Sequence, residues 1–152
     1  MKRVLFVCTG NTCRSPMAAA IAQGLSPEVQ AASAGLGAFE GEPASGNAVK
    51  AMSKRSFSIS DHSARLVSRL EVESAYIVLA MTRSHKRALI EMFPDQAEKI
   101  FSLGEYAGED ADVGDPYGGD LKAYEKCAAQ LEELIRKALE RALSPVDLRD
   151  AE

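Results

Sequence analysis

The chain has 152 residues, 46% hydrophobic and 26% charged, a composition that fits one folded domain with a single sizeable core and excludes intrinsic disorder. Its 18 basic and 22 acidic residues give a formal net charge of −4, which offers no general attraction for nucleic acid or an anionic membrane. The three cysteines, Cys8, Cys13 and Cys127, are too few and too odd in number for a disulfide scaffold.

Neither of the two notable apolar runs has the length of a targeting or membrane-spanning segment. Residues 4–8 (VLFVC) stop at Thr9-Gly10, so this run is shorter than the apolar core of a secretory signal. Residues 75–81 (AYIVLAM) are far short of the roughly 20 residues that span a bilayer. We therefore expect a cytoplasmic protein with reduced thiols and no membrane partner.

Strand and helix signals alternate along the chain. Runs rich in β-branched, aromatic and other apolar residues predict strands over residues 3–7, 28–33, 76–81 and 99–103. Composition, capping residues and apolar spacing predict helices over residues 17–25, 47–54, 83–93 and from Leu121 to Ser144-Pro145. Pro16 is placed in the first turn of the first helix, and Thr82 caps the third.

This β-α alternation predicts a single α/β domain over residues 1–152, in which a four-stranded parallel sheet is flanked by helices on both faces. We expect residues 146–152 to be a frayed tail. In such sheets, ligands bind at the carboxyl ends of the strands, close to the helices that follow. The glycine-rich, acidic stretch 104–119 is predicted to be one long loop with a functional role.

The turn between the first strand and the first helix carries the strongest chemical signal. Its sequence is CTGNTCRSP, residues 8–16. Backbone N–H groups in such a loop, together with the dipole of the following helix, form an anion site. The same field favours the reactive thiolate form of a cysteine placed there, here Cys8. Arg14 can fold back over the loop and present its planar fork of donors to two phosphate oxygens.

Other sites with similar loops do not fit these residues. A Walker-type phosphate loop needs a lysine before Ser15, and a dinucleotide loop needs more glycines than Gly10. A zinc site is disfavoured because Cys8 and Cys13 have no second ligand pair near them in sequence. We therefore expect neither a metal nor a cofactor.

With these residues in place, the sequence resembles the low-molecular-weight protein tyrosine phosphatases, whose signature is Cys-x5-Arg followed by Ser. The resemblance extends to Ser33-Ala34-Gly35, to residues 61–65 (DHSAR), to the strand at 76–81 and to Asp115-Pro116-Tyr117. It therefore covers nearly the whole chain. The family fold is a four-stranded parallel sheet flanked by helices, with the phosphate-binding loop between the first strand and the first helix.

The resemblance implies a mechanism. Cys8 would attack phosphorus to give a phosphocysteine, and Asp115 would protonate the leaving group and then activate water. Arg14 would hold the phosphoryl oxygens together with the amides of the loop, which come from Thr9, Gly10, Asn11, Thr12 and Cys13. Tyr117 is expected to form part of the pocket wall, next to the rigid Pro116.

Supporting residues are implied in the same way. Asn11 would take a left-handed conformation, held by Ser15, Ser33 and His62. Cys13 either traps an oxidised Cys8 as a disulfide or is a small packed side chain, and both interpretations stay open. Cys127 lies on the apolar stripe of the last helix and is expected in the core. His85 matches no motif and is given no role.

Two details bear on the substrate. Many tyrosine-directed members have a bulky aliphatic residue at the position of Thr12 and two aromatic residues after Asp-Pro, where this chain has Tyr117 followed by two glycines. In both details the chain resembles the bacterial protein-arginine phosphatases. We therefore expect a monomeric enzyme that hydrolyses phosphoarginine in phosphorylated proteins, with phosphotyrosine as the alternative.

Two weaker alternatives come from other functional classes. Thioredoxin-coupled arsenate reductases share this fold, but they need further cysteines after the third strand, and residues 82–86 (TRSHK) contain none. A non-catalytic phosphoprotein-binding module would be expected to have lost Cys8, Arg14 or Asp115, and all three are present.

Overall fold

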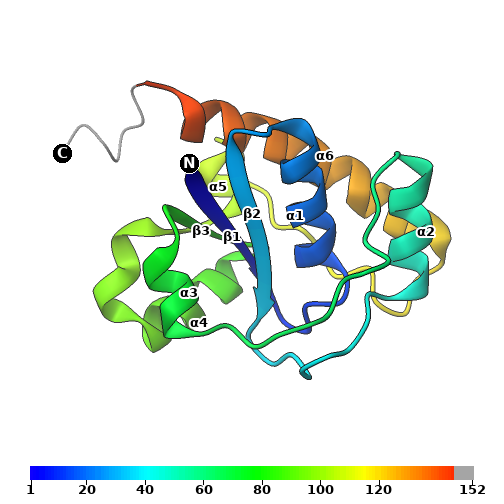
Figure 1. Ribbon diagram of the computed structural model, residues 1–152, viewed down its shortest axis with the longest axis horizontal. Coiled ribbons are helices and arrows are strands. Elements are labelled where there is room, and N and C mark those ends of the chain that lie inside the picture. Colours follow the sequence, from blue (N-terminus) through cyan, green and yellow to red (C-terminus); the bar gives the residue numbers. More distant parts are fainter. Residues whose placement is uncertain (146–152) are drawn as a thin grey trace.

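Four parallel strands form the centre of the structure, a computed structural model that describes residues 1–145 (Figure 1). They are β1 (Lys2–Cys8), β2 (Val29–Gly35), β3 (Ile77–Ala80) and β4 (Ile100–Ser102), and they lie in the spatial order β2-β1-β3-β4. The predicted fold class is confirmed. The tail expected at residues 146–152 lies outside the described residues.

Each face of the sheet has its own apolar core, because alternate residues of a strand point to opposite faces. In β1, Val4 and Phe6 belong to one core, and Leu5 and Val7 belong to the other. The first core is covered by α1 (Arg14–Leu25), α2 (Gly46–Lys54) and α6 (Leu121–Leu143). The second is covered by α3 (Arg69–Ser74) and α4 (Arg83–Met92) (Figure 1).

The predicted helices are confirmed with small shifts at their ends, and their caps explain the boundaries. Thr82 caps α4 by accepting a hydrogen bond from the backbone N–H of His85. Pro94 follows the end of α4 and opens the 3-10 helix η1 (Pro94–Lys99). Ser144 ends α6, as predicted. The short helices α3 and η1 were not predicted.

The prediction of one loop over residues 104–119 is wrong at its start. Residues Leu103–Tyr106 form the short helix α5, which follows β4 directly. Its first turn is closed by a capping box, in which the Ser102 hydroxyl accepts from the Glu105 N–H and the Glu105 carboxylate accepts from the Ser102 N–H. The irregular segment that remains, residues 107–120, is called the 107–120 loop below.

The topology singles out the carboxyl end of β1. Strand β2 lies next to β1 on one side within the sheet, and the chain then passes over β1 to form β3 on its other side. Ligands of open parallel sheets bind at such a reversal of strand order, where the loops diverge and leave a crevice. Among residues 1–145, no helix is long and apolar enough to cross a membrane.

Candidate active site

The β1–α1 loop, residues 8–14, is fastened to the carboxyl end of β2. The carbonyls of Cys8 and Thr9 accept hydrogen bonds of 2.9 Å from the backbone N–H groups of Leu36 and Gly37. Gly35 allows the close approach, since a Cβ there would lie 2.5 Å from the Thr9 carbonyl oxygen. The backbone of the loop is therefore fixed by the strand next to it.

Asn11 turns the loop back on itself. It is fully buried and has a φ of 57°, in the left-handed region. Its side-chain NH2 donates to Ser15 Oγ at 2.8 Å and to Ser33 Oγ at 3.0 Å, and its Oδ1 accepts from the Arg65 N–H at 3.0 Å. Nε2 of His62 lies 2.6 Å from the Asn11 carbonyl oxygen. The structure thus brings together the three residues expected around Asn11 and adds Arg65.

Cys8 contacts Ser15, and the direction of this hydrogen bond follows from the partners of Ser15. The Cys8 sulfur lies 2.9 Å from Ser15 Oγ. Ser15 Oγ accepts from Asn11, so its own proton is free to go either to Cys8 or to the Ala34 carbonyl, which is 3.5 Å away. The sulfur is the nearer acceptor, and its thiolate form is the stronger one, so Ser15 is placed to stabilise the thiolate.

Arg14 joins the β1–α1 loop to the 107–120 loop. Its guanidinium is buried and donates from Nη1 to the Val113 carbonyl at 2.9 Å. Nη2 lies 3.7 Å from Asp115 Oδ2, whose side chain is half exposed. Asp115 Oδ1 also accepts from the Tyr117 N–H at 3.0 Å, which fixes the carboxylate above the loop. The sequence-distant pair Arg14 and Asp115 therefore meets in the fold.

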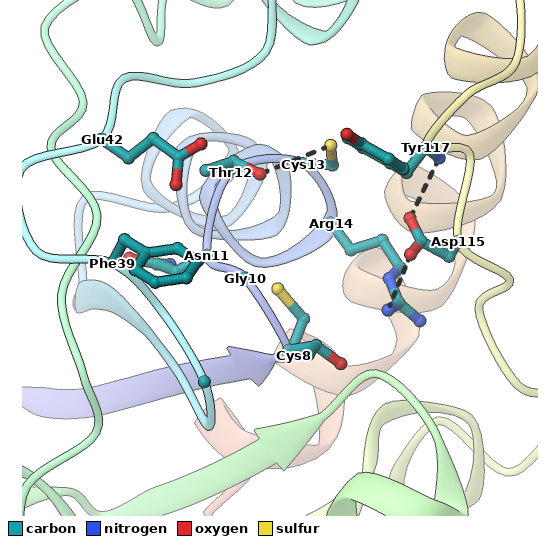
Figure 2. A pocket seen from close by; sticks show the side chains of 12 residues that line it. Cys8, Gly10, Asn11, Thr12, Cys13, Arg14, Phe39, Glu42, Asp115 and Tyr117 are labelled. Atoms are coloured by element: carbon teal, nitrogen blue, oxygen red, sulfur yellow. Dashed lines mark hydrogen bonds and ion pairs between the residues drawn. The ribbon is translucent and has the colours of Figure 1, made fainter.

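These groups line one cavity of about 290 Å³ (Figure 2). Figure 2 shows Tyr117 and Asp115 on one side of the β1–α1 loop and Phe39 and Glu42 on the other. The side chains of Phe39 and Tyr117 are more than three-quarters exposed, at 77% and 76%. Sequence analysis missed Phe39 and Glu42, because nothing in their local sequence distinguishes them from an ordinary exposed loop. The residues of the cavity are Cys8, Thr9, Gly10, Asn11, Thr12, Cys13, Arg14, Gly37, Phe39, Glu42, Asp115 and Tyr117.

The three cysteines have different surroundings, and all three are free thiols. Cys13 is buried, with its sulfur 3.5 Å from Ser45 Oγ and 3.6 Å from the Tyr124 hydroxyl oxygen. Cys127 lies on the buried side of α6, as expected, and burial raises the pKa of its thiol to about 12. Cys127 is therefore a thiol with almost no thiolate at neutral pH.

His85, which matches no sequence motif, also lies against the β1–α1 loop. Its Nε2 is 2.8 Å from the hydroxyl oxygen of Thr9. The two residues are 76 positions apart, so no local pattern could connect them. The motif of residues 8–16 contains Thr9 but not His85, so it could not predict this contact.

The arrangement defines a chemical class. A thiol lies at the floor of a loop whose amides and buried Arg14 favour a bound anion, and the Asp115 carboxylate stands over it. These groups provide a nucleophile, a clamp for phosphoryl oxygens and an acid–base group for a leaving group. They are the parts of a phosphoryl-transfer enzyme that works through cysteine.

Comparison with known proteins agrees with this class. The family described as low molecular weight phosphotyrosine protein phosphatase matches residues 3–145. A protein-arginine-phosphatase of Geobacillus stearothermophilus is 40% identical over 141 residues, which cover 91% of this chain and 95% of the relative. The chain belongs to this family and is a cysteine-dependent protein phosphatase.

Two solved structures are similar over nearly their whole length. A low molecular weight protein tyrosine phosphatase from T. tengcongensis is 46% identical, with a TM-score of 0.90 over 93% of this chain and 99% of that one. A mutant of the YwlE arginine phosphatase with a phosphorylated active-site serine is 36% identical. Its TM-score is 0.89, and the match covers 94% of this chain and 97% of that one.

The cysteine environments predict selective alkylation. Iodoacetamide at about pH 8 should modify Cys8 in the folded protein and leave Cys127 unmodified, because buried Cys127 has almost no thiolate at that pH. Peptide mass spectrometry measures the modification at each site, and urea-unfolded protein, in which all three cysteines should react, is the control. Alkylation of native Cys127 as fast as that of Cys8 would contradict this assignment.

Proposed function

We propose that the protein hydrolyses phosphoarginine in phosphorylated proteins through a phosphocysteine intermediate. The observation that carries this proposal is the lining of the cavity, which combines the small polar Thr12 with two acidic residues, Glu42 and Asp115, on opposite sides of the β1–α1 loop (Figure 2). In this proposal Cys8, Arg14 and Asp115 are the catalytic residues. The amides of residues 9–13 bind the phosphoryl group, and Tyr117 forms part of the wall.

In the first step, the Cys8 sulfur attacks phosphorus and the bond from phosphorus to the arginine nitrogen breaks. Arg14 and the loop amides neutralise the charge on the three equatorial oxygens. Binding of the phosphoryl group to Arg14 competes with the 3.7 Å contact to Asp115, which frees the carboxyl group for the leaving nitrogen. The electron pair of the broken bond goes to that nitrogen and Asp115 gives it a proton, so arginine leaves with an intact guanidinium group.

In the second step, water replaces the cysteine on phosphorus. Asp115, now a carboxylate, takes a proton from the water, whose oxygen attacks phosphorus while the bond from sulfur to phosphorus breaks. Inorganic phosphate and the Cys8 thiolate are the products, and Ser15 is placed to stabilise the thiolate as leaving group. Thr12 leaves space and offers a hydroxyl for the attacking water.

Charge at the mouth of the cavity favours a substrate that carries a cation next to its phosphate. Phosphoarginine has a guanidinium at that place, and phosphotyrosine has an uncharged ring. Glu42 is exposed, and its carboxylate would repel a phosphate alone but attract a guanidinium. The Geobacillus protein-arginine-phosphatase, 40% identical to this chain, supports the same choice.

The direct test is turnover of phosphoarginine, phosphotyrosine and phosphoserine peptides of one sequence, measured as released phosphate. We expect kcat/KM to be highest for phosphoarginine, because only this substrate carries a cation that pairs with the Glu42 carboxylate. Cys8→Ser is the control for the nucleophile, and it should lower kcat by at least about 10³-fold while phosphate still binds. Higher kcat/KM for phosphotyrosine would reject phosphoarginine as the preferred substrate. A kcat of Cys8→Ser close to that of the unaltered protein would reject Cys8 as the nucleophile.

Phosphotyrosine hydrolysis is the second candidate, and the aromatic residues favour it. Phe39 and Tyr117 flank the mouth from opposite sides and would contact the two faces of a phenol ring (Figure 2). The similarity to the low molecular weight protein tyrosine phosphatase of T. tengcongensis supports this second candidate. The side chain at position 12 distinguishes the two candidates.

Thr12→Ile should shift the preference toward phosphotyrosine. The larger apolar side chain removes the hydroxyl and narrows the space beside the reacting phosphorus, which disfavours the polar guanidinium. We expect the ratio of kcat/KM for phosphoarginine over phosphotyrosine to fall by about tenfold or more. Thr12→Ser, which keeps the hydroxyl, is the matched control. An unchanged ratio in Thr12→Ile would show that Thr12 does not select the substrate.

We also propose that Cys13 protects Cys8 from irreversible oxidation. The two thiols belong to the same short loop and line the same cavity. Peroxide would convert Cys8 to a sulfenic acid, and the Cys13 thiol would displace water from it to form a disulfide. Trapping requires Cys13 to leave its contacts with Ser45 and Tyr124.

Peptide mapping after treatment with hydrogen peroxide tests this role. We expect a Cys8–Cys13 disulfide and recovery of activity with dithiothreitol. In Cys13→Ser, the same treatment should give sulfinic or sulfonic acid at Cys8, and activity should not return. Irreversible oxidation of Cys8 in the unaltered protein, without the disulfide, would reject the protective role.

We also propose three features of the whole molecule. We propose a single phosphatase domain over residues 1–152, supported by one sheet whose two cores involve all the described helices except η1. A monomer is supported because Cys8, Arg14 and Asp115 come together within one chain. A reducing, cytoplasmic location is supported by three free cysteines and a site that needs a thiolate.

A further inference from the structure

The first turn of α4 contacts both loops of the active site. His85 in this turn is buried and reaches Thr9 of the β1–α1 loop. Arg83 in the same turn reaches the 107–120 loop: its backbone N–H donates to Asp112 Oδ1 at 3.1 Å, and its guanidinium lies 2.8 Å from Asp110 and 3.3 Å from Asp112. One helical turn is therefore in contact with the loop of Cys8 and with the loop of Asp115.

Both ring nitrogens of His85 have a hydroxyl partner. Thr82 Oγ1 accepts the His85 backbone N–H at 3.1 Å and lies 3.0 Å from His85 Nδ1. His85 Nε2 lies 2.8 Å from Thr9 Oγ1. Because a hydroxyl can donate or accept, either neutral tautomer of the ring satisfies both contacts. Thr82, His85 and Thr9 therefore form one chain of hydrogen bonds.

The charges around His85 agree with a neutral ring. Burial, and then the positive charge of Arg14, hold the pKa of the His85 imidazole below its ordinary value. Asp112 and Asp115 act in the opposite direction but do not outweigh these two effects. A neutral imidazole has one donor and one acceptor, which matches the two hydroxyl partners of its ring.

The hydrogen bond to Thr9 is the better candidate for a rigid connection than the ion pairs of Arg83. The Arg83 and Asp110 side chains are 55% and 90% exposed, and ion pairs that are exposed to solvent contribute little to stability. The His85 ring is buried, and both of its nitrogens are fixed by partners. Loss of His85 would leave the α4 side of Thr9 without its hydrogen bond, while the β2 side stays fixed through Gly37.

We propose that His85 is a positioning residue for phosphoryl transfer. Through its hydrogen bond to Thr9, it fixes the position of the β1–α1 loop relative to the 107–120 loop. The proposal rests on the cysteine phosphatase chemistry of the site and holds whichever phosphorylated residue is the substrate. The phosphate-binding amides stay in place without His85, because Asn11 and Gly35 fix them independently. His85 therefore sets the distance between attacking sulfur and protonating carboxyl group, a distance to which reaction rates are very sensitive.

The test uses two aryl phosphates that differ in how much they need Asp115. p-Nitrophenyl phosphate has a good leaving group, whereas phenyl phosphate depends on proton transfer to its oxygen. In His85→Leu, we expect kcat/KM for phenyl phosphate to fall by about tenfold or more. The fold-decrease in kcat/KM for p-nitrophenyl phosphate should be several times smaller. The inhibition constant of inorganic phosphate should change less than about threefold, because the binding amides are retained.

Three further variants separate positioning from a general structural role. His85→Gln places a side-chain amide, which can donate or accept, near the position of Nε2 and should restore most of the loss. Thr9→Val removes the hydroxyl partner without touching α4 and should reproduce the loss. The double variant Thr9→Val/His85→Leu should be no worse than either single one, because both remove the same hydrogen bond.

Several results would overturn the proposal. These are equal losses for the two aryl phosphates, no recovery in His85→Gln, full activity in Thr9→Val, or multiplied losses in the double variant. A rise in the inhibition constant of phosphate in proportion to the loss of kcat/KM would show that His85 supports binding instead of positioning. Failure of the phosphoarginine assignment leaves these results unaffected, because the test substrates contain no arginine.

Discussion

The active site depends on the left-handed turn at Asn11. A φ of 57° is unfavourable for most residues, and here it is stabilised by partners from three separate segments: Ser15 in α1, Ser33 in β2, and His62 with Arg65 in the segment before α3. Because these partners use every polar group of the Asn11 side chain, the loop is already formed before any anion arrives. The enzyme therefore spends little binding energy on ordering its own amides.

This preformed loop resolves an apparent conflict of charge. The chain carries a net charge of −4, yet it is built to bind a phosphate. The buried Arg14 guanidinium and the loop amides act over a few ångströms in a region shielded from water, where the net charge of the surface has little influence. In the function that we propose, the exposed residues Glu42 and Asp115 act on the rest of the substrate, so anion binding and substrate choice are carried by different groups.

Sequence analysis was most successful where neighbouring residues carry the signal. Local alternation and capping predicted the four strands and the long helices, and the spacing of Cys8 and Arg14 predicted the loop between them. Asp115 was assigned its role through the family resemblance, and locally only the following Pro116 and Tyr117 separate it from Asp110 and Asp112. His85, Phe39 and Glu42 were not found at all, since their relevance comes from contacts across the fold. The start of the 104–119 stretch was misjudged because a glycine masked the capped turn of α5.

The parallel sheet explains how such distant residues come together. The carboxyl ends of all four strands meet at one edge: β1 leads into the nucleophile loop, and β2 into the segment with Phe39 and Glu42. β3 leads into the first turn of α4 with His85, and β4 leads through α5 to the loop of Asp115. Each part of the site is thus attached to its own strand. The segment after β2 does two things: its Leu36 and Gly37 hold the backbone of the β1–α1 loop, and its Phe39 and Glu42 line the cavity. The side chains of Phe39 and Glu42 take no part in the hydrogen bonds that fix Asn11, so the left-handed turn does not depend on them.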